Sequence, residues 1–425
     1  MVKYLVRVLG CKVNQYEAAQ IRQLLNERGA VEAEADEVAD LVVVHSCAVT
    51  AEAVRKVRNF IRRGVKHSPN AKIIVSGCAA KGDIVERELP GYCYVRPGKG
   101  WLTRLNRELD PLNINHVRED GFDEDLLPLK GFSKHHRAFL KIQDGCDICC
   151  TYCIVPRLRG PSRDKPLLNI LDEAEGLVAS GHKEIVITGV SVGLYGKKSG
   201  VSLARVVNKL AGIAGIERLR LSSLHPAELT DELLNVWAAH PKILPHIHLP
   251  LQSGSDRVLR DMGRGYTRRD FLAAVERAVN ALDRPAFNTD IIVGFPGETE
   301  TDFNDTAALC REVGFARIHI FQYSPRPGTR AASLDGGEAK AETVARAARL
   351  KTLSKELEQK FYARFIGTTA RVLTETFDEH ASICRGYTER YIPTSFPGDN
   401  NAVGRIKQVR LVTAGAEGVE GAICG

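Results

Sequence analysis

The chain has 425 residues, eleven cysteines and a formal net charge of +7. This length permits two or three domains with buried cores, and the modest positive charge permits a polyanionic partner without requiring one. The sequence has no apolar run of the roughly 18 residues that cross a bilayer, and the opening run MVKYLVRVLG is too short for a signal sequence. We therefore expect a cytoplasmic protein that binds no membrane, in a reducing compartment where grouped cysteines more often bind metals than form disulfides.

Apolar runs and amphipathic segments alternate over residues 1–100. Strands are predicted at 3–9, 41–45 and 72–76, followed by helices such as 17–28 and 51–65. This alternation indicates an α/β domain with a parallel sheet, in which the strand ends line up at one edge. A cysteine follows each strand, namely Cys11, Cys47 and Cys78. Each alone is a typical buried core cysteine, but together they predict a three-cysteine metal cluster at that edge, with Cys93 left as structural.

Six basic residues lie in the helix predicted at 51–65 or directly after it, with no acidic residue between them: Arg55, Lys56, Arg58, Arg62, Arg63 and Lys66. Such a group is either a solvated basic face or part of a polyanion contact. Residues 103–137 are polar and mixed, with several prolines and glycines, and predict irregular structure.

A second α/β series begins near residue 138. Strands are predicted at 138–143, 184–189, 218–222, 246–250, 288–294 and 316–323, and they are separated by helices such as 168–180, 202–211, 231–239, 268–281 and 300–313. Six strand and helix pairs are too few for a closed eight-fold barrel and predict a partial one. Barrels of this kind carry their sites at the C-terminal ends of the strands.

A cysteine-rich loop follows the first strand of this series. Cys146, Cys150 and Cys153 have the spacing C-x3-C-x2-C, and three thiolates leave one iron of a 4Fe-4S cluster without a protein ligand. A zinc site is the alternative, because Cys146 and Cys149 also form a C-x2-C pair that Cys153 and a distant histidine could complete. We expect Cys149 to be a non-ligand.

The end of the chain changes character. A charged, alanine-rich helix is predicted from about residue 337 to 361, and the last 60 or so residues are rich in strand-forming runs broken by turns. These runs predict a small antiparallel β-barrel, a shape that often binds nucleic acids. Its charges are nearly balanced, so RNA binding would depend on the local placement of five basic residues: Arg385, Arg390, Arg405, Lys407 and Arg410. A purely structural appendage is the alternative.

Three long motifs accompany the cysteine loop: LGCKVNQYE at 9–17, LPLQSGSD at 249–256 and GFPGET at 294–299. With them, the chain resembles the radical S-adenosylmethionine (SAM) methylthiotransferase family over almost its full length. The resemblance implies an N-terminal α/β methylthiotransferase domain at 1–110, a linker at 111–131, a radical SAM partial (β/α)6 barrel plus helix at 132–360 and a TRAM-like β domain at 361–425. The first motif resembles the branch that modifies N6-threonylcarbamoyladenosine beside the anticodon.

The family resemblance implies two 4Fe-4S clusters and SAM as cofactors. Cys146, Cys150 and Cys153 would hold the cluster that cleaves SAM, and Cys11, Cys47 and Cys78 an auxiliary cluster that carries the sulfur. One SAM would supply the methyl group, and a second the 5′-deoxyadenosyl radical that abstracts hydrogen from C2 of adenine. The partners implied are the anticodon stem-loop of tRNA and an electron donor such as flavodoxin or ferredoxin.

Tyr152 of the cysteine loop and residues at or near other strand ends are the candidates for binding SAM. The predicted set, placed by comparison with the family pattern, is Tyr152, Thr188, Gly189, Ser223, Gln252, Asp290 and Val293. Polar residues at strand ends also serve as helix caps. Arg159 and Arg163 could meet the SAM carboxylate, the threonylcarbamoyl group or a phosphate, and the sequence does not choose among these.

Two further functions compete with this one. The first is methylthiolation of another target, either isopentenyladenosine in tRNA or a ribosomal protein, with the same two clusters. The second is a metal-containing RNA-binding protein without catalysis, which the basic groups and the C-terminal β domain would suit. Simple electron transfer is disfavoured, because such carriers normally have every iron ligated.

Overall fold

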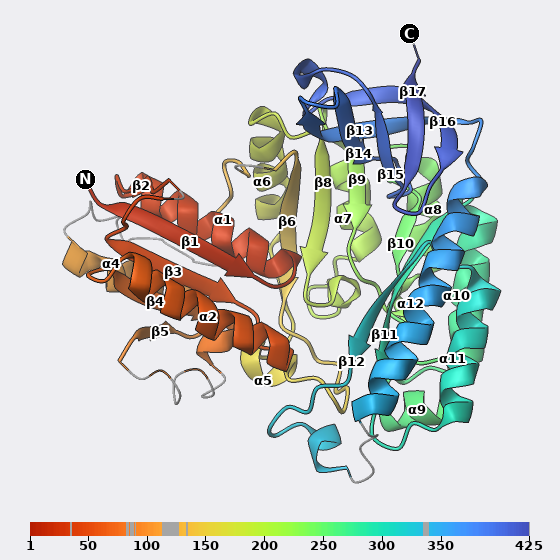
Figure 1. Cartoon of the computed structure of the whole chain (residues 1–425), viewed down its shortest axis with the longest axis horizontal. Helices are drawn as coiled ribbons and strands as arrows, with labels where there is room; N and C mark the ends of the chain where they lie inside the picture. Colours follow the sequence, from red (N-terminus) through yellow and green to blue (C-terminus); the bar gives the residue numbers. More distant parts are fainter. Residues whose placement is uncertain are drawn as a thin grey trace. The chain divides into compact units, whose positions relative to one another are not determined.

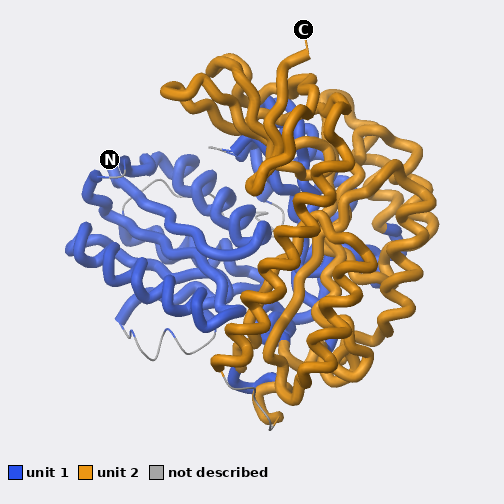
Figure 2. Tube along the Cα trace, turned by 45° about the vertical axis from the view of Figure 1, so that its right-hand side comes forward, with its two compact units in different colours: residues 1–149, 153–202, 326–329 blue, residues 150–152, 203–325, 330–425 orange. Residues whose placement is uncertain are grey.

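The computed structural model describes residues 1–34, 36–81, 85, 89, 91–112, 127–132, 135–334 and 340–424. The chain divides into two compact units, which Figure 2 shows in different colours. Unit 1 comprises residues 1–149, 153–202 and 326–329, and unit 2 comprises residues 150–152, 203–325 and 330–425. Most of the predicted linker at 111–131 lies outside the described residues.

A five-stranded parallel sheet forms the N-terminal part of unit 1, in the order β2-β1-β3-β4-β5 (Figure 1). Its strands are β1 Lys3–Leu9, β2 Val31–Glu32, β3 Leu41–Ser46, β4 Lys72–Gly77 and β5 Cys93–Val95. The central strand β3 is buried along its whole length, which explains its continuous apolar run. The three predicted strands are present, and Cys93 begins β5.

Helices cover both faces of this sheet. α1 (Lys12–Glu27) and α4 (Trp101–Leu109) share one hydrophobic core with the sheet, and α2 (Ala51–His67) shares the other. Alternate residues of β3 divide between the two cores, with Leu41 and Val43 in the first and Val42 and Val44 in the second. This follows from the two-residue period of a strand, and it yields the three-layer α/β arrangement that the sequence predicts.

Helix α4 corrects one expectation. Residues 103–109 were predicted to be irregular, but they belong to α4. Apolar residues at 101, 102, 105 and 109 recur at helical spacing and are all buried against the sheet. Trp101 and Leu102 lie just before residues 103–137, which are polar overall. The helical spacing of the apolar residues is therefore recognised only when residues 101–109 are considered together.

The rest of unit 1 contains the first strands of the second series. β8 (Glu184–Gly189) pairs parallel with β6 (Arg137–Asp144), and the short β7 (Arg163–Asp164) pairs antiparallel with the end of β6. Helices α5 (Val155–Arg159) and α6 (Leu167–Ala179) complete this part. The cysteine loop therefore starts where β6 ends, as predicted.

Unit 2 contains the remaining strands of the series. β10 (His246–His248), β11 (Ala286–Val293) and β12 (Arg317–Gln322) form a parallel sheet. Leu219 of β9 (Arg218–Leu221) forms a parallel bridge with Ile243. The helices are α7 Leu203–Gly212, α8 Asp231–Ala239, α9 Asp256–Asp261, α10 Arg268–Ala281, α11 Glu300–Val313 and α12 Lys340–Ala363. Across the described helices, none combines the length and apolarity that crossing a bilayer requires.

Threonine caps explain why three of these helices start where the sequence predicts. Thr230, Thr267 and Thr299 each accept a hydrogen bond from a backbone N–H in the first turn of α8, α10 and α11. In α10 and α11 an aspartate at the third helical position bonds back to the cap, which completes a capping box. These local signals fix the boundaries independently of tertiary packing.

The C-terminal strands close into a barrel in the order β13-β14-β15-β17-β16. Their bounds are β13 Thr369–Asp378, β14 Ile383–Tyr387, β15 Pro393–Pro397, β16 Ile406–Ala414 and β17 Val419–Ile423. The pairings are antiparallel except that β15 and β17 run parallel. Arg218 and Arg220 of β9 donate to backbone carbonyls of this barrel at residues 371 and 387–389, which ties the barrel to the rest of unit 2.

Candidate metal centres

Cys11, Cys47 and Cys78 lie at the same edge of the N-terminal sheet. The strand register pairs Leu9 with Ser46 and Ser46 with Gly77, so the residues that follow these strands lie side by side. The backbone N–H of Cys47 donates to the carbonyl of Leu9 at 3.0 Å. Cys11 is exposed, Cys47 is partly buried and Cys78 is buried. The convergence expected from the sequence is therefore present.

Two glycines make this close approach possible. Gly77 has a φ of +78°, and a Cβ there would lie 2.6 Å from the carbonyl oxygen of Ser46. Gly10 has a φ of +130°, and a Cβ there would lie 2.8 Å from the Cβ of Cys47. Any larger residue would push the strand ends apart, so both glycines keep the thiols together.

Burial makes two of these thiols weak acids. It raises the pKa of Cys47 to about 12, and the neighbouring Cys78 and Cys11 act in the same direction. Burial also raises the pKa of Cys78, although the guanidinium of Arg159 favours the thiolate. Since metal ligands must be thiolates, metal binding has to release these protons.

Metal affinity at this edge should therefore rise steeply with pH. In a variant lacking Cys146, Cys150 and Cys153, we expect the dissociation constant of Co²⁺ to fall by at least about a hundredfold per pH unit between pH 7 and 8, because at least Cys47 and Cys78 each lose a proton. The thiolate-to-Co²⁺ absorption band under anaerobic conditions measures this. An affinity that did not change with pH would mean that the thiols are already ionised.

A buried ionic network lies beside the three thiols. The guanidinium of Arg159 donates to both carboxylate oxygens of Glu17, at 2.7 and 2.9 Å, and to Asp144 at 3.0 Å. Lys141 contacts the same two carboxylates, and His45 contacts Glu17 at 3.0 Å. Although burial opposes ionisation, Arg159 and Lys141 hold the pKa of Glu17 well below its usual range. Arg159 was a candidate for binding the SAM carboxylate, the threonylcarbamoyl group or a phosphate. In the structure its guanidinium is hydrogen-bonded to carboxylates of its own unit.

The residues at this edge fit a thiolate-bound cluster. The three thiols supply soft ligands, and Arg159 provides positive charge next to Cys78. Asn14 is fully buried, and its Oδ1 accepts from the Cys11 thiol at 3.3 Å. Its Nδ2 has no hydrogen-bond partner among the described residues, and a buried donor of this kind suits a cluster sulfide.

The second cysteine group lies in the loop after β6. Gly145 begins the loop with a φ of +72°, and a Cβ there would lie 2.1 Å from the carbonyl oxygen of Pro161. The backbone N–H of Ile148 donates to the sulfur of Cys146 at 3.4 Å. Cys146, Cys150 and Cys153 are partly buried, whereas Cys149 is exposed and directs its thiol at the carbonyl of Asp147. Cys11 is exposed as well, so exposure does not distinguish ligands from non-ligands, and both the ligand set and the non-ligand role of Cys149 remain predictions.

Arg264 is a site residue that the sequence did not reveal. Its guanidinium is buried in unit 2 and donates to the sulfur of Cys150 at 3.2 Å. The hydroxyl of Tyr266 lies 3.3 Å from its Nε and itself donates to the carbonyls of Pro250 and Leu251. Despite burial, the charges of Tyr152, Tyr266 and Cys150 raise the pKa of Arg264. No sequence motif connects residue 264 with residue 150, and only the fold brings them together.

Replacing Arg264 with Gln should weaken SAM cleavage. The change removes a buried cation beside the Cys150 sulfur and with it a charged hydrogen bond of about 1.5–3 kcal/mol. We therefore expect a reduced cluster that is harder to form and a rate of 5′-deoxyadenosine formation at least about tenfold lower. Arg264→Lys should recover part of the rate, and Arg268→Gln, at the partly exposed start of α10, should not change it. A redox titration that gave the same potential for R264Q and the wild type would contradict this role.

The predicted SAM residues are distributed over both units. In unit 1, Thr188 and Gly189 end β8, and Thr188 is buried. In unit 2, Tyr152 packs against a core cluster that contains Phe295, and Val293 is buried at the end of β11. These positions remain predictions for SAM contacts.

Gln252, Ser223 and Asp290 have more specific surroundings. Gln252 has a φ of +70°, unusual for a residue with a side chain, and its backbone is held by Asp290 and Ile292. Strained backbone of this kind is concentrated at functional sites, which supports the prediction for Gln252. The Ser223 hydroxyl and the Asp290 carboxylate both contact the ring of His248, at 2.7 and 3.0 Å.

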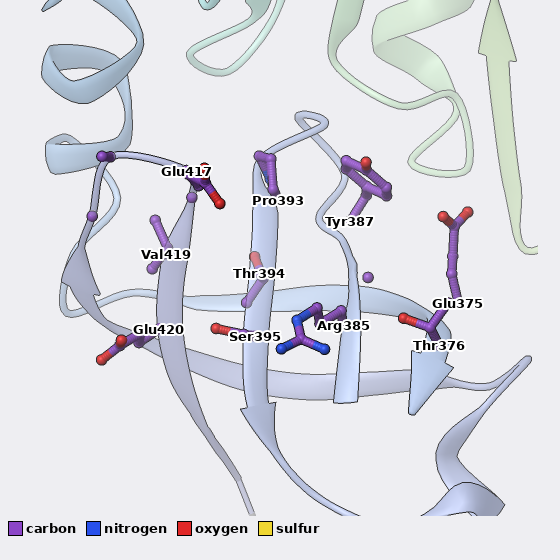
Figure 3. A pocket seen from close by; sticks show the side chains of 14 residues that line it. Glu375, Thr376, Arg385, Tyr387, Pro393, Thr394, Ser395, Glu417, Val419 and Glu420 are labelled. Atoms are coloured by element: carbon purple, nitrogen blue, oxygen red, sulfur yellow. The ribbon is translucent and has the colours of Figure 1, made fainter. Parts of the chain in front are cut away.

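The C-terminal barrel carries a pocket of about 570 Å³ (Figure 3). Arg385 and Tyr387 line it together with three carboxylates, those of Glu375, Glu417 and Glu420. This acidic lining does not suit a phosphate. Of the basic residues expected to bind RNA, Arg390 is held by the carboxylate of Asp283 at 2.8 Å and Arg385 by Asp378 at 3.2 Å.

Comparison with known families agrees with this arrangement. Residues 140–310 match the Radical SAM superfamily, and residues 3–89 match a family described as Uncharacterized protein family UPF0004. The first match covers the cysteine loop and its following strands, and the second covers the edge with Cys11, Cys47 and Cys78.

Curated relatives match nearly the whole chain. It is 37% identical to the threonylcarbamoyladenosine tRNA methylthiotransferase MtaB of Thermotoga maritima, over 97% of this chain and 95% of the relative. It is 34% identical to the MtaB of Bacillus subtilis, over 96% and 93%. It is 35% identical to the tRNA-2-methylthio-N(6)-dimethylallyladenosine synthase of Erythrobacter litoralis, over 98% and 96%.

Among solved structures, the radical S-adenosylmethionine methyltransferase TsrM of Kitasatospora setae, with cobalamin and a [4Fe-4S] cluster bound, has a similar fold. The TM-score is 0.57 at 15% identity, with 78% of this chain and 77% of TsrM covered. At this identity the likeness supports the fold alone.

Proposed function

Because the chain belongs to the radical SAM tRNA methylthiotransferase family, we propose that it converts N6-threonylcarbamoyladenosine at position 37 of tRNA to its 2-methylthio derivative. The chain is a transferase that acts on tRNA, and its cofactors are SAM and 4Fe-4S clusters. The observation that carries the proposal is the presence of two separate cysteine triplets on one chain, one at a sheet edge and one in the loop after β6.

The target atom explains why the reaction needs a radical from a cofactor. The C2–H of adenine is neither acidic nor electrophilic enough for ordinary acid–base or nucleophilic chemistry, so a cofactor must supply the reactive species and the protein must position and shield it. When bound, one SAM supplies the methyl group and a second supplies the 5′-deoxyadenosyl radical. We assign Cys146, Cys150 and Cys153 to the cluster that binds SAM, and Cys11, Cys47 and Cys78 to the auxiliary cluster.

The remaining assignments concern SAM and the partners. Tyr152, Thr188, Gly189, Gln252 and Val293 are proposed to shape the SAM site, with Ser223 and Asp290 beside them. The RNA partner is proposed to be the anticodon stem-loop, where an unpaired adenine leaves its stack at little cost. A small electron carrier such as flavodoxin or ferredoxin would reduce the cluster in the cytoplasm.

The choice of the threonylcarbamoyl substrate is supported by the relatives from Thermotoga maritima and Bacillus subtilis, whose names state it. The dimethylallyl substrate is a second candidate, because the Erythrobacter litoralis relative is almost as similar at 35% identity. The two groups differ in chemistry, since one ends in a carboxylate and the other is entirely apolar.

In vitro turnover with defined tRNAs tests the choice. The cluster-loaded enzyme would be supplied with SAM, a reductant and tRNA whose adenosine 37 is threonylcarbamoylated, dimethylallylated or unmodified, and the digested nucleosides would be analysed by mass spectrometry. We expect the 2-methylthio product only from the threonylcarbamoylated tRNA. Product from the dimethylallylated tRNA alone would overturn the substrate, and 5′-deoxyadenosine without any methylthio nucleoside would point to a different target.

A further inference from the structure

A second group of potential metal ligands lies in unit 2, apart from the cysteines. His248 comes from β10, Asp290 from β11 and His319 from β12. Asp290 and His319 are direct partners in the strand register, and His248 pairs with Asn288, two residues before Asp290. Because side chains alternate along a strand, the three residues share one face of the sheet. Ile291 and Ile318, their immediate neighbours in sequence, are buried on the opposite face.

The three side chains converge closely enough to hold one ion. One ligand atom from each residue lies within 4.8 Å of the others, and His248 Nε2 is 3.0 Å from Asp290 Oδ1. Ligands that bind one transition metal at about 2.0–2.2 Å are typically about 3 Å apart, so the His248–Asp290 pair already has the required spacing. The rings of His248 and His319 lie 5.7 Å apart, nearly perpendicular.

A further contact orients the first ligand. The other ring nitrogen of His248, Nδ1, lies 2.7 Å from the hydroxyl of Ser223. Metal-binding histidines usually use their second nitrogen for such a hydrogen bond, which fixes the ring and its tautomer. Without an ion, Nε2–H of His248 donates to the Asp290 carboxylate and Nδ1 accepts from the Ser223 hydroxyl. An ion that took the place of the Nε2 proton would leave Nδ1 protonated and donating to Ser223. All three candidate ligands are partly buried and not sealed in the core, so an ion could reach them.

We propose that His248, Asp290 and His319 bind a divalent transition-metal ion through two imidazoles and one carboxylate. This ligand set, on one side of the ion, is the arrangement that suits Fe²⁺ or Mn²⁺ and leaves positions open for water or a substrate oxygen. Thiolates are absent from the group, so its preference differs from that of the cysteine sites. The ion would engage Asp290 directly and Ser223 through His248, which gives both residues a role distinct from the predicted SAM contacts.

Manganese binding tests the site in the cluster-loaded protein. Oxidised 4Fe-4S clusters are diamagnetic, so loss of the free Mn²⁺ electron paramagnetic resonance signal reports binding directly. We expect about one Mn²⁺ per chain, at least tenfold weaker binding in His319→Ala and Asp290→Asn, and a tenfold to hundredfold loss in Ser223→Ala. His240→Ala is the matched control, because His240 is a partly buried histidine of the same unit that is bonded to Asn208 and not to the proposed ligands.

The outcomes separate this site from the cysteine centres. Iron content and the absorption of the clusters should be the same in all these variants, and circular dichroism would verify that Asp290→Asn keeps its fold. Absence of Mn²⁺ binding by the wild type, or equal binding by the wild type and His319→Ala, would overturn the proposal. Neither result depends on turnover, so the assignment of the methylthiolation substrate would stand or fall separately.

Discussion

Replacing Cys11, Cys47 and Cys78 with alanine should remove about half of the iron of the reconstituted protein while SAM cleavage continues. Each 4Fe-4S cluster holds four irons, so the content should fall from about eight to about four per chain. The substitutions are small, and the sheet beside these residues has its own hydrophobic cores. Methylthiolation of tRNA should be abolished, because the centre assigned to sulfur delivery is lost. Iron analysis, 5′-deoxyadenosine formation and nucleoside mass spectrometry measure the three effects.

The reciprocal variant is the internal control. With alanine at Cys146, Cys150 and Cys153, about four irons should again remain, but neither 5′-deoxyadenosine nor product should form. Cys149→Ser should behave like the wild type, because Cys149 lies outside the C-x3-C-x2-C spacing of the assigned ligands. Loss of iron in Cys149→Ser but not in Cys150→Ser would reverse the assignment within the loop, and SAM cleavage lost from both triple variants would refute the division of labour.

The position of Cys11, Cys47 and Cys78 at one edge of the sheet could be predicted from the sequence. Each strand can be recognised locally, and parallel strands end at the same edge. Each strand is a short apolar run, each is followed by a helix, and the right-handed α/β arrangement puts all strand ends on one side. Nothing about distant contacts was needed. The same reasoning located the loop after β6 and most helices of unit 2, whose threonine caps are themselves local signals.

The electrostatic surroundings of the sites could not be predicted in this way. Arg159 and Glu17 are 142 positions apart, and Arg264 and Cys150 are 114 apart. An isolated arginine or glutamate carries no signal of its partner, because charged residues are common and are mostly solvated. Only the fold shows that these side chains are buried and paired, and therefore that they act on the cysteine sites.

The structure also changes the meaning of the first motif. Asn14 contacts the thiol of Cys11, Tyr16 donates to Glu173, and Glu17 binds Arg159. All three are buried within unit 1, so these positions build the cysteine edge and its ionic network. The motif therefore belongs to the cysteine edge, and the substrate assignment rests on the named relatives.

Replacing Glu17 with Gln should destabilise unit 1 strongly. Both Glu17 and Arg159 are almost completely buried, with side chains 3% exposed, and removing one partner of a buried ion pair typically costs about 3–5 kcal/mol. The urea midpoint of the cluster-loaded protein under anaerobic conditions, followed by circular dichroism, should fall accordingly. Glu52→Gln is the matched control, because its pair with Arg55 is exposed, and it should leave the midpoint unchanged.

Two further measurements test whether loss of the buried charge causes the destabilisation of Glu17→Gln. The pKa of Glu17 is lower in the folded state than its ordinary value of 4.5, so its contribution to stability is fully present above about pH 4.5 and disappears as the pH falls through the folded pKa. The difference between wild type and Glu17→Gln should therefore be constant from pH 6 to 8. Combining Glu17→Gln with Arg159→Met should cost less than the sum of the single changes, since no unpaired charge remains between them. Additive losses would show that the two side chains act independently.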